Sequence, residues 1–206
     1  MFKAELHCHT TYSDGRDSVR KVIEAAIAKG INIIAITDHD CVEASLEAEE
    51  IVEEENLPLR VITASEITTT NGHLLAYGIR RDVDAGMDIA ETCEEVRRLG
   101  GLTFVAHPFD FIRGGTLRLK SFSVADGVEV FNSKSYVNFL ARRFAKRFEK
   151  PGIAGSDAHS VRSVGLAVNL LKDSSLNSLL SASYVARRMP IGERLRSLLP
   201  PPRRKP

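Results

Sequence analysis

All six histidines of the chain lie in short motifs whose other residues are of types that bind divalent metal. Neutral imidazole and carboxylate are ordinary ligands of zinc, manganese and iron. Each motif alone could be structural, but so many coincidences in one chain are implausible. We therefore expect two to three divalent metal ions, held by His7, His9, Asp14, His39, Glu66, His73, His107, Asp157 and His159.

Two motifs place a pair of candidate ligands two residues apart. His7 and His9 lie on a predicted strand, where alternate residues share a face and both imidazoles can reach one ion. Asp157 and His159 repeat this spacing after another strand, although a Gly-Ser-Asp turn with an exposed histidine fits equally well. Asp14 lies in a Ser-Asp-Gly turn five residues after His9 and could supply a carboxylate to a neighbouring ion.

Glu66 and His73 flank a predicted hairpin. Glu66 ends a hydrophobic strand, and its two oxygens could bridge two ions. Asn71-Gly72 is a strong two-residue turn signal. A tight turn at these two residues would separate Glu66 from His73 by about 13 Å, too far for a shared metal. A wider loop from Thr68 to Gly72 would remove the conflict, so His73 stays in the set on that condition.

Several other residues at strand ends could contact the substrate or orient a ligand. Asp38 is assigned to orient an imidazole, with capping of the following helix as the alternative. Arg113, in a Gly-flanked loop, is the first choice for contacting substrate and binding phosphate. Lys134 and Arg16 are further phosphate-binding candidates, each of which could instead be solvated surface charge. Asn132 ends a strand and could meet the substrate or a metal-bound water.

The sequence contains no motif for a catalytic serine or cysteine and none for binding a nucleotide. It has no G-x-S-x-G elbow, no GxGxxG or Walker loop, and no spare histidine to activate a serine or cysteine. Three carboxylates and three divalent ions would leave a charge of about +3 for hydroxide and a bound anion. Bound ions bring the pKa of water to about 7 and stabilise both oxygens of an in-line displacement. The ligand set therefore favours hydrolysis of a phosphoester by a metal-activated water.

Length and charge limit the possible organisation and partners. The 206 residues fit one domain, predicted to cover residues 1–198, and the Pro- and Arg-rich tail 199–206 is expected to be disordered. A net charge of +1 gives no general attraction to nucleic acid or to anionic membranes. We therefore expect a small phosphorylated substrate, while the oligomeric state stays open.

Cysteine usage and the N-terminus bear on the compartment. Three cysteines without close pairing argue against a disulfide framework and favour a reducing environment. The first residues lack the basic stretch and apolar core of a signal peptide, and no apolar run approaches about 20 residues. A cytoplasmic, soluble protein is the expectation.

Strand-like and helix-like segments alternate along the chain. The predicted strands cover 2–8, 31–37, 60–64, 102–106, 127–131, 152–154 and 166–171, and the predicted helices cover 18–29, 42–55, 88–99 and 136–149, with a Ser- and Leu-rich helix at the end. Such β-then-α repeats imply parallel strands joined by right-handed crossovers.

The candidate ligands follow the ends of five strands. In a barrel these ends converge on one mouth, whereas a doubly wound sheet collects only a few at its switch point. Five contributing strand ends therefore favour an α/β barrel, with an irregularity at the hairpin.

Together these motifs resemble the PHP family, named for polymerase and histidinol phosphatase, over nearly the whole chain to about Leu171. The resemblance rests on His7-x-His9, Ser13-Asp14-Gly15, Thr37-Asp38-His39-Asp40, Glu66, His73, His107-Pro108 and Gly155-Ser156-Asp157-Ala158-His159. It implies a distorted (β/α)7 TIM-like barrel, a trinuclear zinc, manganese or iron site, and metal-dependent phosphoesterase activity.

The resemblance also implies a distribution of the ligands over three ions. One ion would take His7, His9, Glu66 and Asp157; a second would take Glu66, His73 and His107; a third would take Asp14, His39 and His159.

Three functions remain after this reading of the sequence. The first is hydrolysis of a phosphomonoester, which a small stand-alone member would perform. The second is a phosphodiesterase or exonuclease acting on nucleotides or oligonucleotides, for which no basic stripe is visible. The third is a non-catalytic metal-binding regulatory module. The complete ligand set argues against the third.

Overall fold

The computed structural model describes residues 1–197, so the predicted tail 199–206 lies outside the described residues. The strands are β1 (Phe2–Glu5), β2 (Ile33–Ile34), β3 (Arg60–Val61), β4 (Ala64–Thr69), β5 (Gly72–Tyr77), β6 (Leu102–Val105), β7 (Gly127–Asn132), β8 (Gly152–Gly155), β9 (Ala167–Leu171) and β10 (Ser183–Ala186). The helices are α1 (Val19–Ala28), α2 (Glu43–Glu54), α3 (Ile89–Arg98), α4 (Lys120–Val124), α5 (Asn138–Arg147) and α6 (Ile191–Ser197), with 3-10 turns η1 (Phe111–Arg113) and η2 (Leu176–Ser181).

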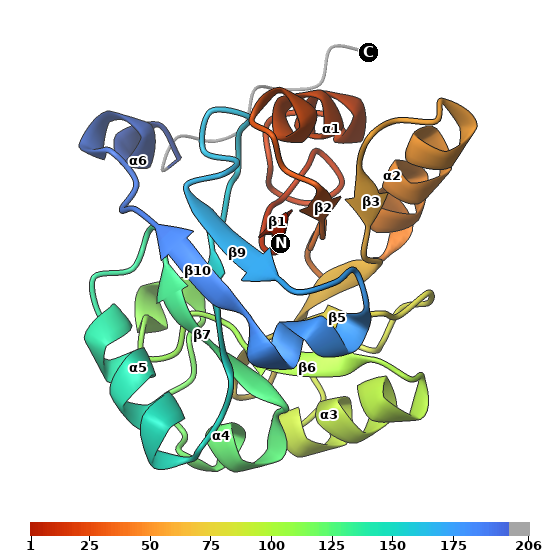
Figure 1. The fold of residues 1–206 in the computed structure, drawn as a ribbon. Helices are drawn as coiled ribbons and strands as arrows, with labels where there is room; N and C mark the ends of the chain where they lie inside the picture. The colour runs from red at the N-terminus through yellow and green to blue at the C-terminus, as the bar shows by residue number, and fades with distance from the viewer. Residues whose placement is uncertain (198–206) are drawn as a thin grey trace.

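The strands form two five-stranded mixed sheets, in the orders β10-β9-β1-β2-β3 and β4-β5-β6-β7-β8 (Figure 1). β1, β2 and β3 are parallel, as are β6, β7 and β8. The α/β class is therefore confirmed. The predicted hairpin is confirmed as the antiparallel pair β4–β5, whereas the expected parallel pairing is wrong for β5–β6 and for β9, which pairs antiparallel with β1 and β10. A short turn joins β4 to β5, and such a turn permits only antiparallel pairing.

Two isolated β-bridges link segments that follow β1, β2 and β8 to one another or to β4. One joins His39 to Glu66 and the other joins Cys8 to Ala158. The second is reinforced by a hydrogen bond from His9 N to Ala158 O at 2.8 Å. These bridges bring together the segments that carry the candidate ligands. Because they are isolated bridges and not a continuous ladder, a closed barrel stays a prediction.

Helices cover the outer faces of both sheets. α1 and α2 turn apolar residues such as Val22 and Ala48 toward β2, and α3, α4 and α5 lie along the second sheet (Figure 1). α3 begins after Asp88, whose side chain accepts a hydrogen bond from Ala90 N at 2.9 Å. None of the described helices is long and apolar enough to cross a bilayer.

The segment after Leu171 differs from the sequence prediction. The expected Ser- and Leu-rich α-helix is instead the 3-10 turn η2, followed by β10. Tyr184 and Val185 have side chains that favour strands, and β10 pairs with β9 through these residues. Strand pairing therefore replaces the last predicted helix.

Candidate metal centre

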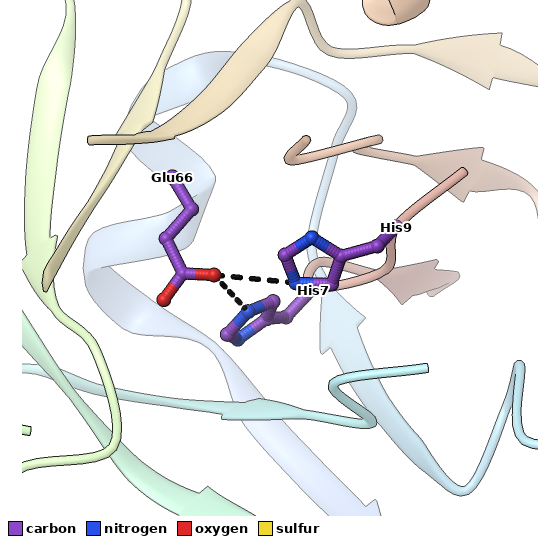
Figure 2. A group of neighbouring side chains, drawn as sticks. All are labelled: His7, His9 and Glu66. Carbon is purple, nitrogen blue, oxygen red and sulfur yellow. Dashed lines mark hydrogen bonds and ion pairs between the residues drawn. The ribbon is translucent and has the colours of Figure 1, made fainter. Parts of the chain in front are cut away.

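Glu66 of β4 lies at the centre of the predicted ligand set. Its Oε2 atom is 3.1 Å from His7 Nε2 and 3.2 Å from His9 Nε2, as Figure 2 shows. All three side chains are buried. The two histidines follow β1 at alternate positions, so they approach the same carboxylate oxygen from one side, as the spacing predicted.

The other imidazoles reach Glu66 from different segments. Its Oε1 atom is 3.1 Å from His73 Nδ1 and 2.8 Å from His107 Nε2. His39 Nδ1 lies 3.8 Å from Oε2. One buried carboxylate thus lies within 4 Å of five imidazoles.

The hairpin register explains how His73 reaches this position. Thr69 pairs with Gly72 and Thr68 pairs with His73, so the turn residues are Thr70 and Asn71. Glu66 is then two residues from the partner of His73 and points to the same face. The turn is tight, but it lies one residue earlier than Asn71-Gly72. The separation of about 13 Å would have required a turn at Asn71-Gly72, which the structure does not have, and the wider loop is not needed.

Asp14 and His159 lie beside His9. Asp14 Oδ2 is 2.8 Å from His159 Nε2, and Asp14 Oδ1 is 3.6 Å from His9 Nδ1. Asp14 is half exposed and His9 is buried. The loop after β1 and the segment after β8 therefore close one side of the ligand cluster.

Asp157 contacts the same cluster through one oxygen. Its Oδ1 atom is 3.3 Å from His159 Nδ1, 3.7 Å from His9 Nε2 and 4.0 Å from His7 Nε2. The residue adopts φ 50°, a conformation uncommon for non-glycine residues. His107 also has a positive φ, 26°. Such conformations persist only where the surrounding structure holds them, and they gather at functional sites.

Unpartnered nitrogen atoms indicate that the cluster suits metal. Both ring nitrogens of His9 and Nδ1 of His107 are buried and make no hydrogen bond to any described residue, although those of His9 face the carboxylates of Glu66 and Asp14 at 3.2 and 3.6 Å. Buried polar atoms almost always have a partner, so these nitrogens are available as ligands. Imidazole and carboxylate donors in this density match the preferences of zinc, manganese or iron.

The geometry defines five groups of three donors, with all donor atoms of a group within 4.8 Å of one another. They are His7–His9–Glu66, His7–His107–Asp157, His9–Asp14–His39, His9–Asp157–His159 and His39–Glu66–His73. The first group agrees with the expected distribution. His73 and His107 fall into different groups, whereas the resemblance had placed them on one ion.

Charge in the cluster is balanced between carboxylates and imidazoles. Burial opposes ionisation of Glu66, but the His7 charge and a hydrogen bond with His107 hold its pKa well below the usual range. Burial also opposes ionisation of Asp157, and Lys134 with the nearby histidines keeps its pKa low. Burial and the neighbouring His159 lower the pKa of His9 to about 4. Ionised carboxylates and a neutral His9 are the forms that bind metal.

Glu129 on β7 is a site residue that the sequence analysis missed. Its Oε1 atom is 2.8 Å from His7 Nδ1, and its Oε2 atom accepts a hydrogen bond from His107 N at 2.7 Å. A carboxylate on Nδ1 leaves Nε2 of His7 free to face Glu66 and a metal. A side chain at Gly155 would collide with the Glu129 carboxylate. The available signal was a lone glutamate inside a hydrophobic strand.

Replacing Glu129 with glutamine is expected to weaken metal binding by roughly 10- to 100-fold, because the amide cannot accept from both His7 and His107. Calorimetric titration of metal into metal-free protein measures this change. Glu94→Gln makes the same substitution at an exposed position on α3 and should bind metal like the wild type. Equal affinities in all three proteins would contradict the positioning role.

Glu5 is a second buried carboxyl that the sequence analysis missed. It accepts hydrogen bonds from Gly165 N at 2.7 Å, His7 N at 3.3 Å and Ser156 Oγ. Burial is the largest influence and raises the pKa of Glu5 to about 7. Glu5 therefore ties the first strand to the segment that precedes Asp157.

The raised pKa of Glu5 predicts a pH-dependent stability. The folded protein binds a proton that the unfolded chain has lost above pH 4.5, so this stabilisation is full below that value and is lost as pH rises through about 7. The loss amounts to about 3 kcal/mol at most. Urea unfolding of metal-free protein should show a smaller decline for Glu5→Gln than for the wild type. Parallel pH curves for the two proteins would exclude the effect.

Asp38 does not orient an imidazole, contrary to expectation. Its Oδ1 atom accepts from Thr10 N at 2.9 Å and from Ser13 N at 3.0 Å, and Oδ2 accepts from Thr10 Oγ1 at 2.6 Å. Nor does it cap the following helix, because no side chain among the described residues caps the N-terminus of α2 and the Asp38 carboxylate accepts from Thr10 and Ser13. Asp38 instead fixes the loop that carries Asp14.

Two of the four predicted substrate contacts line the central pocket. This pocket has a volume of about 310 Å³ and is lined by Asp14, His39, Glu66, His73, His107, Arg113, Lys134, Asp157 and His159. The NH1 atom of Arg113 is buried and has no hydrogen-bond partner among the described residues. Lys134 Nζ lies 3.0 Å from Asp157 Oδ1 and 2.8 Å from His159 Nδ1.

The other two predicted contacts lie elsewhere. Asn132 is fully buried, and its Nδ2 atom donates to Glu129 at 3.1 Å and to Asp157 at 3.3 Å. It therefore supports the carboxylates and does not line the pocket. Arg16 lines a neighbouring pocket, and its guanidinium donates to Arg196 O. The positions of Asn132 and Arg16 in the sequence therefore did not determine the direction of their side chains.

The chain matches two family models. A PHP domain model matches residues 5–142, and a PHP-associated model matches residues 136–183. An uncharacterised protein of Methanocaldococcus jannaschii is 34% identical over 143 residues, which make up 64% of this chain and 82% of that protein. A 5′-3′ exoribonuclease of Haemophilus influenzae is 42% identical over 67 residues, or 32% of this chain and 24% of that enzyme.

A solved structure shares the fold. It is a two-domain protein from Bacteroides vulgatus that contains a predicted PHP-like metal-dependent phosphoesterase. The superposition has a TM-score of 0.75 at 19% identity and covers 95% of this chain and 68% of that chain. At this identity the likeness concerns the arrangement of the chain.

Proposed function

The chain belongs to the PHP domain family of phosphoester hydrolases, and we propose that it hydrolyses a phosphomonoester at a centre of three divalent ions. One observation carries the proposal. The same pocket holds Glu66, which lies within 4 Å of five imidazoles, and the guanidinium of Arg113, whose NH1 atom makes no hydrogen bond to any described residue and lies 3.7 Å from Asp110 Oδ2 and 3.9 Å from Asp157 Oδ2. Metal ligands and an anion-binding group therefore face one space.

The nine predicted ligands would hold the ions, with Glu66 shared between two of them. Divalent ions held there would supply positive charge to the phosphoryl oxygens and lower the pKa of a water nucleophile. Glu129 keeps His7 oriented through Nδ1, and Asp38 keeps the Asp14 loop in place. The chain thus supplies a preorganised site, which stabilises developing charge without rearrangement.

Arg113 and Lys134 would bind the phosphate. Arg113 lines the pocket and donates through NH2 to Lys134 O at 3.3 Å, while its NH1 atom makes no hydrogen bond to any described residue and lies in longer ion pairs with Asp110 and Asp157. A guanidinium binds two phosphate oxygens at once, whereas an ammonium acts as a compact charge. A pocket of about 310 Å³ is suited to one phosphoryl group and its immediate substituent.

The finer architecture forms part of the proposal. Residues 1–198 would form one domain, and the two bridged sheets would together make the distorted barrel that the resemblance implies. Convergence of the ligands from several strand ends supports this arrangement.

A second candidate function is a phosphodiesterase or exonuclease. The match to an exoribonuclease favours it, although that match spans only 32% of this chain. The two candidates differ in the substrate that turns over. Metal-loaded protein is expected to hydrolyse p-nitrophenyl phosphate at least about tenfold more efficiently than bis(p-nitrophenyl) phosphate. The reverse order would favour the diesterase, and activity that persists in Asp157→Ala protein would indicate a contaminant.

A further inference from the structure

The ammonium group of Lys134 lies among the expected metal ligands. Its Nζ atom is 3.0 Å from Asp157 Oδ1 and 2.8 Å from His159 Nδ1. Lys134 is only 5% exposed, so its charge is not a solvated surface charge. A positive charge held between two candidate ligands engages donor atoms that a divalent ion would otherwise use.

The contact with Lys134 determines which nitrogen of His159 carries the ring proton. An ammonium group has three donors and no acceptor, so His159 Nδ1 must accept this hydrogen bond. The proton of the neutral imidazole is then on Nε2, which lies 2.8 Å from Asp14 Oδ2 and donates to it. In this arrangement neither nitrogen of His159 has a free lone pair for a metal ion.

The third ion of the expected distribution would need these same residues. Its ligands would be Asp14, His39 and His159, and the hydrogen bonds just described engage two of the three. Metal binds an imidazole through an unprotonated nitrogen. Coordination by Nε2 therefore requires that the ring proton leave Nε2 for water and that another bind at Nδ1. Nδ1 cannot carry a proton while Lys134 donates to it, so Lys134 and the third ion exclude each other.

His159 has a second partner that suits the metal-bound form. Its Nδ1 atom is also 3.1 Å from Asp157 O. Once Lys134 withdraws, a proton on Nδ1 would have this carbonyl as its acceptor, and Nε2 would be free to coordinate. A backbone carbonyl is a usual partner for the second nitrogen of a metal-bound histidine. The two forms of His159 thus differ in hydrogen bonding while the ring keeps its place.

Only the side chain of Lys134 has to move. Its carbonyl oxygen accepts from Arg113 at 3.3 Å and from Arg194 at 2.5 Å. Its backbone nitrogen donates to Asn132 Oδ1 at 2.9 Å. Lys134 also lines the central pocket of about 310 Å³, so the withdrawn ammonium would enter the space that the proposed substrate phosphate occupies.

We infer that Lys134 is an internal competitor of the third divalent ion. Its ammonium holds His159 and Asp14 in hydrogen bonds, and the ion binds there only when the ammonium moves into the central pocket. This inference rests on the proposed centre of three ions. Two ions should therefore bind more tightly than the third, and binding of the third should displace Lys134.

Equilibrium dialysis of metal-free protein against increasing free Mn²⁺ tests this inference, with bound metal per chain measured by mass spectrometry. The wild type should bind two ions first and the third at a concentration at least about tenfold higher. Lys134→Met should bind the third ion at least about tenfold more tightly than the wild type, because the competing ammonium is gone.

Arg113→Met is the matched control for the loss of charge. It removes a positive charge 3.9 Å from Asp157 Oδ2 but leaves Lys134 bonded to His159 Nδ1, so the third ion should stay weakly bound. A gain in third-ion affinity as large as that of Lys134→Met would show that charge alone is responsible, and would overturn the competition.

Nitrogen-15 NMR of the His159 ring in the wild type is a second test that needs no variant. Metal-free protein should show the Nε2–H tautomer, and zinc-saturated protein should show Nδ1–H with Nε2 coordinated. The Nδ1–H tautomer in both states would overturn the role of Lys134.

The outcomes separate this inference from the function on which it rests. Three ions of the same affinity in wild-type and Lys134→Met protein leave the three-ion centre intact and overturn only the competition. Wild-type and Lys134→Met proteins that bind no Mn²⁺, or never more than two ions, overturn the three-ion centre and the competition with it.

Discussion

Glu66→Gln protein is expected to lose at least about a thousandfold in kcat/KM on p-nitrophenyl phosphate, a change of about 4 kcal/mol. Glu66 is within 4 Å of five imidazoles, so no other carboxylate in the described cluster can replace it. The amide removes a negative charge and turns a donor group toward the metal ligands. Steady-state kinetics at saturating metal measure the effect.

Metal analysis of the same variant shows whether the loss arises at the metal centre. We expect fewer bound ions per chain than in the wild type, while Glu94→Gln protein keeps both its metal content and its activity. Glu66→Gln protein that is as active as the wild type would contradict the central position of this carboxylate.

Removing divalent ions should abolish turnover and lower Tm by roughly 10 °C. Ligand binding at about 1,000 times Kd stabilises a folded protein by about 4 kcal/mol, and a domain of this length changes Tm by about 2–4 °C per kcal/mol. The unpartnered nitrogens of His9 and His107 give the physical reason, because bound ions satisfy them. Differential scanning calorimetry before and after chelation measures the shift.

Restoring the ions serves as the control for that experiment. Added zinc, manganese or iron should return both Tm and activity, with the best metal identified by comparison. An unchanged Tm and full activity after exhaustive chelation would show that the cluster is structural without metal.

Much of the site could be predicted because it depends on residue type and strand position. His7 and His9 share a strand face, and Asp157 and His159 repeat the spacing, so alternation alone brought each pair to one place. The structure gathers all nine predicted side chains into one cluster. Parallel strands also place their C-terminal ends at one edge, which explains why distant segments meet.

The errors arise where side-chain direction or strand register decides. The hairpin sequence is compatible with a tight turn at Asn71-Gly72 and with one at Thr70-Asn71. The structure has the second, and this shift of one residue brings Glu66 close to His73. Asn132 ends β7 and Arg16 follows Asp14 in the loop before α1, yet Asn132 donates to Glu129 and Arg16 lines the neighbouring pocket.

Glu129 and Glu5 were missed for a different reason. Each is a single buried carboxyl on a strand, Glu5 at the end of β1 and Glu129 within β7, and its partner, His7 N or Nδ1, is defined only by the fold. Such a residue costs free energy unless it is hydrogen-bonded, so a charged residue in a buried strand should itself be read as a sign of a site.

Anomalous X-ray diffraction from crystals of the metal-loaded protein tests most directly whether Glu66 and the surrounding histidines bind metal. We expect anomalous peaks about 2 Å from Nε2 of His7 and His9 and from the Glu66 carboxylate, with further peaks beside Asp14 and His73. A well-ordered cluster without anomalous density, or metal bound only away from Glu66, would contradict this expectation.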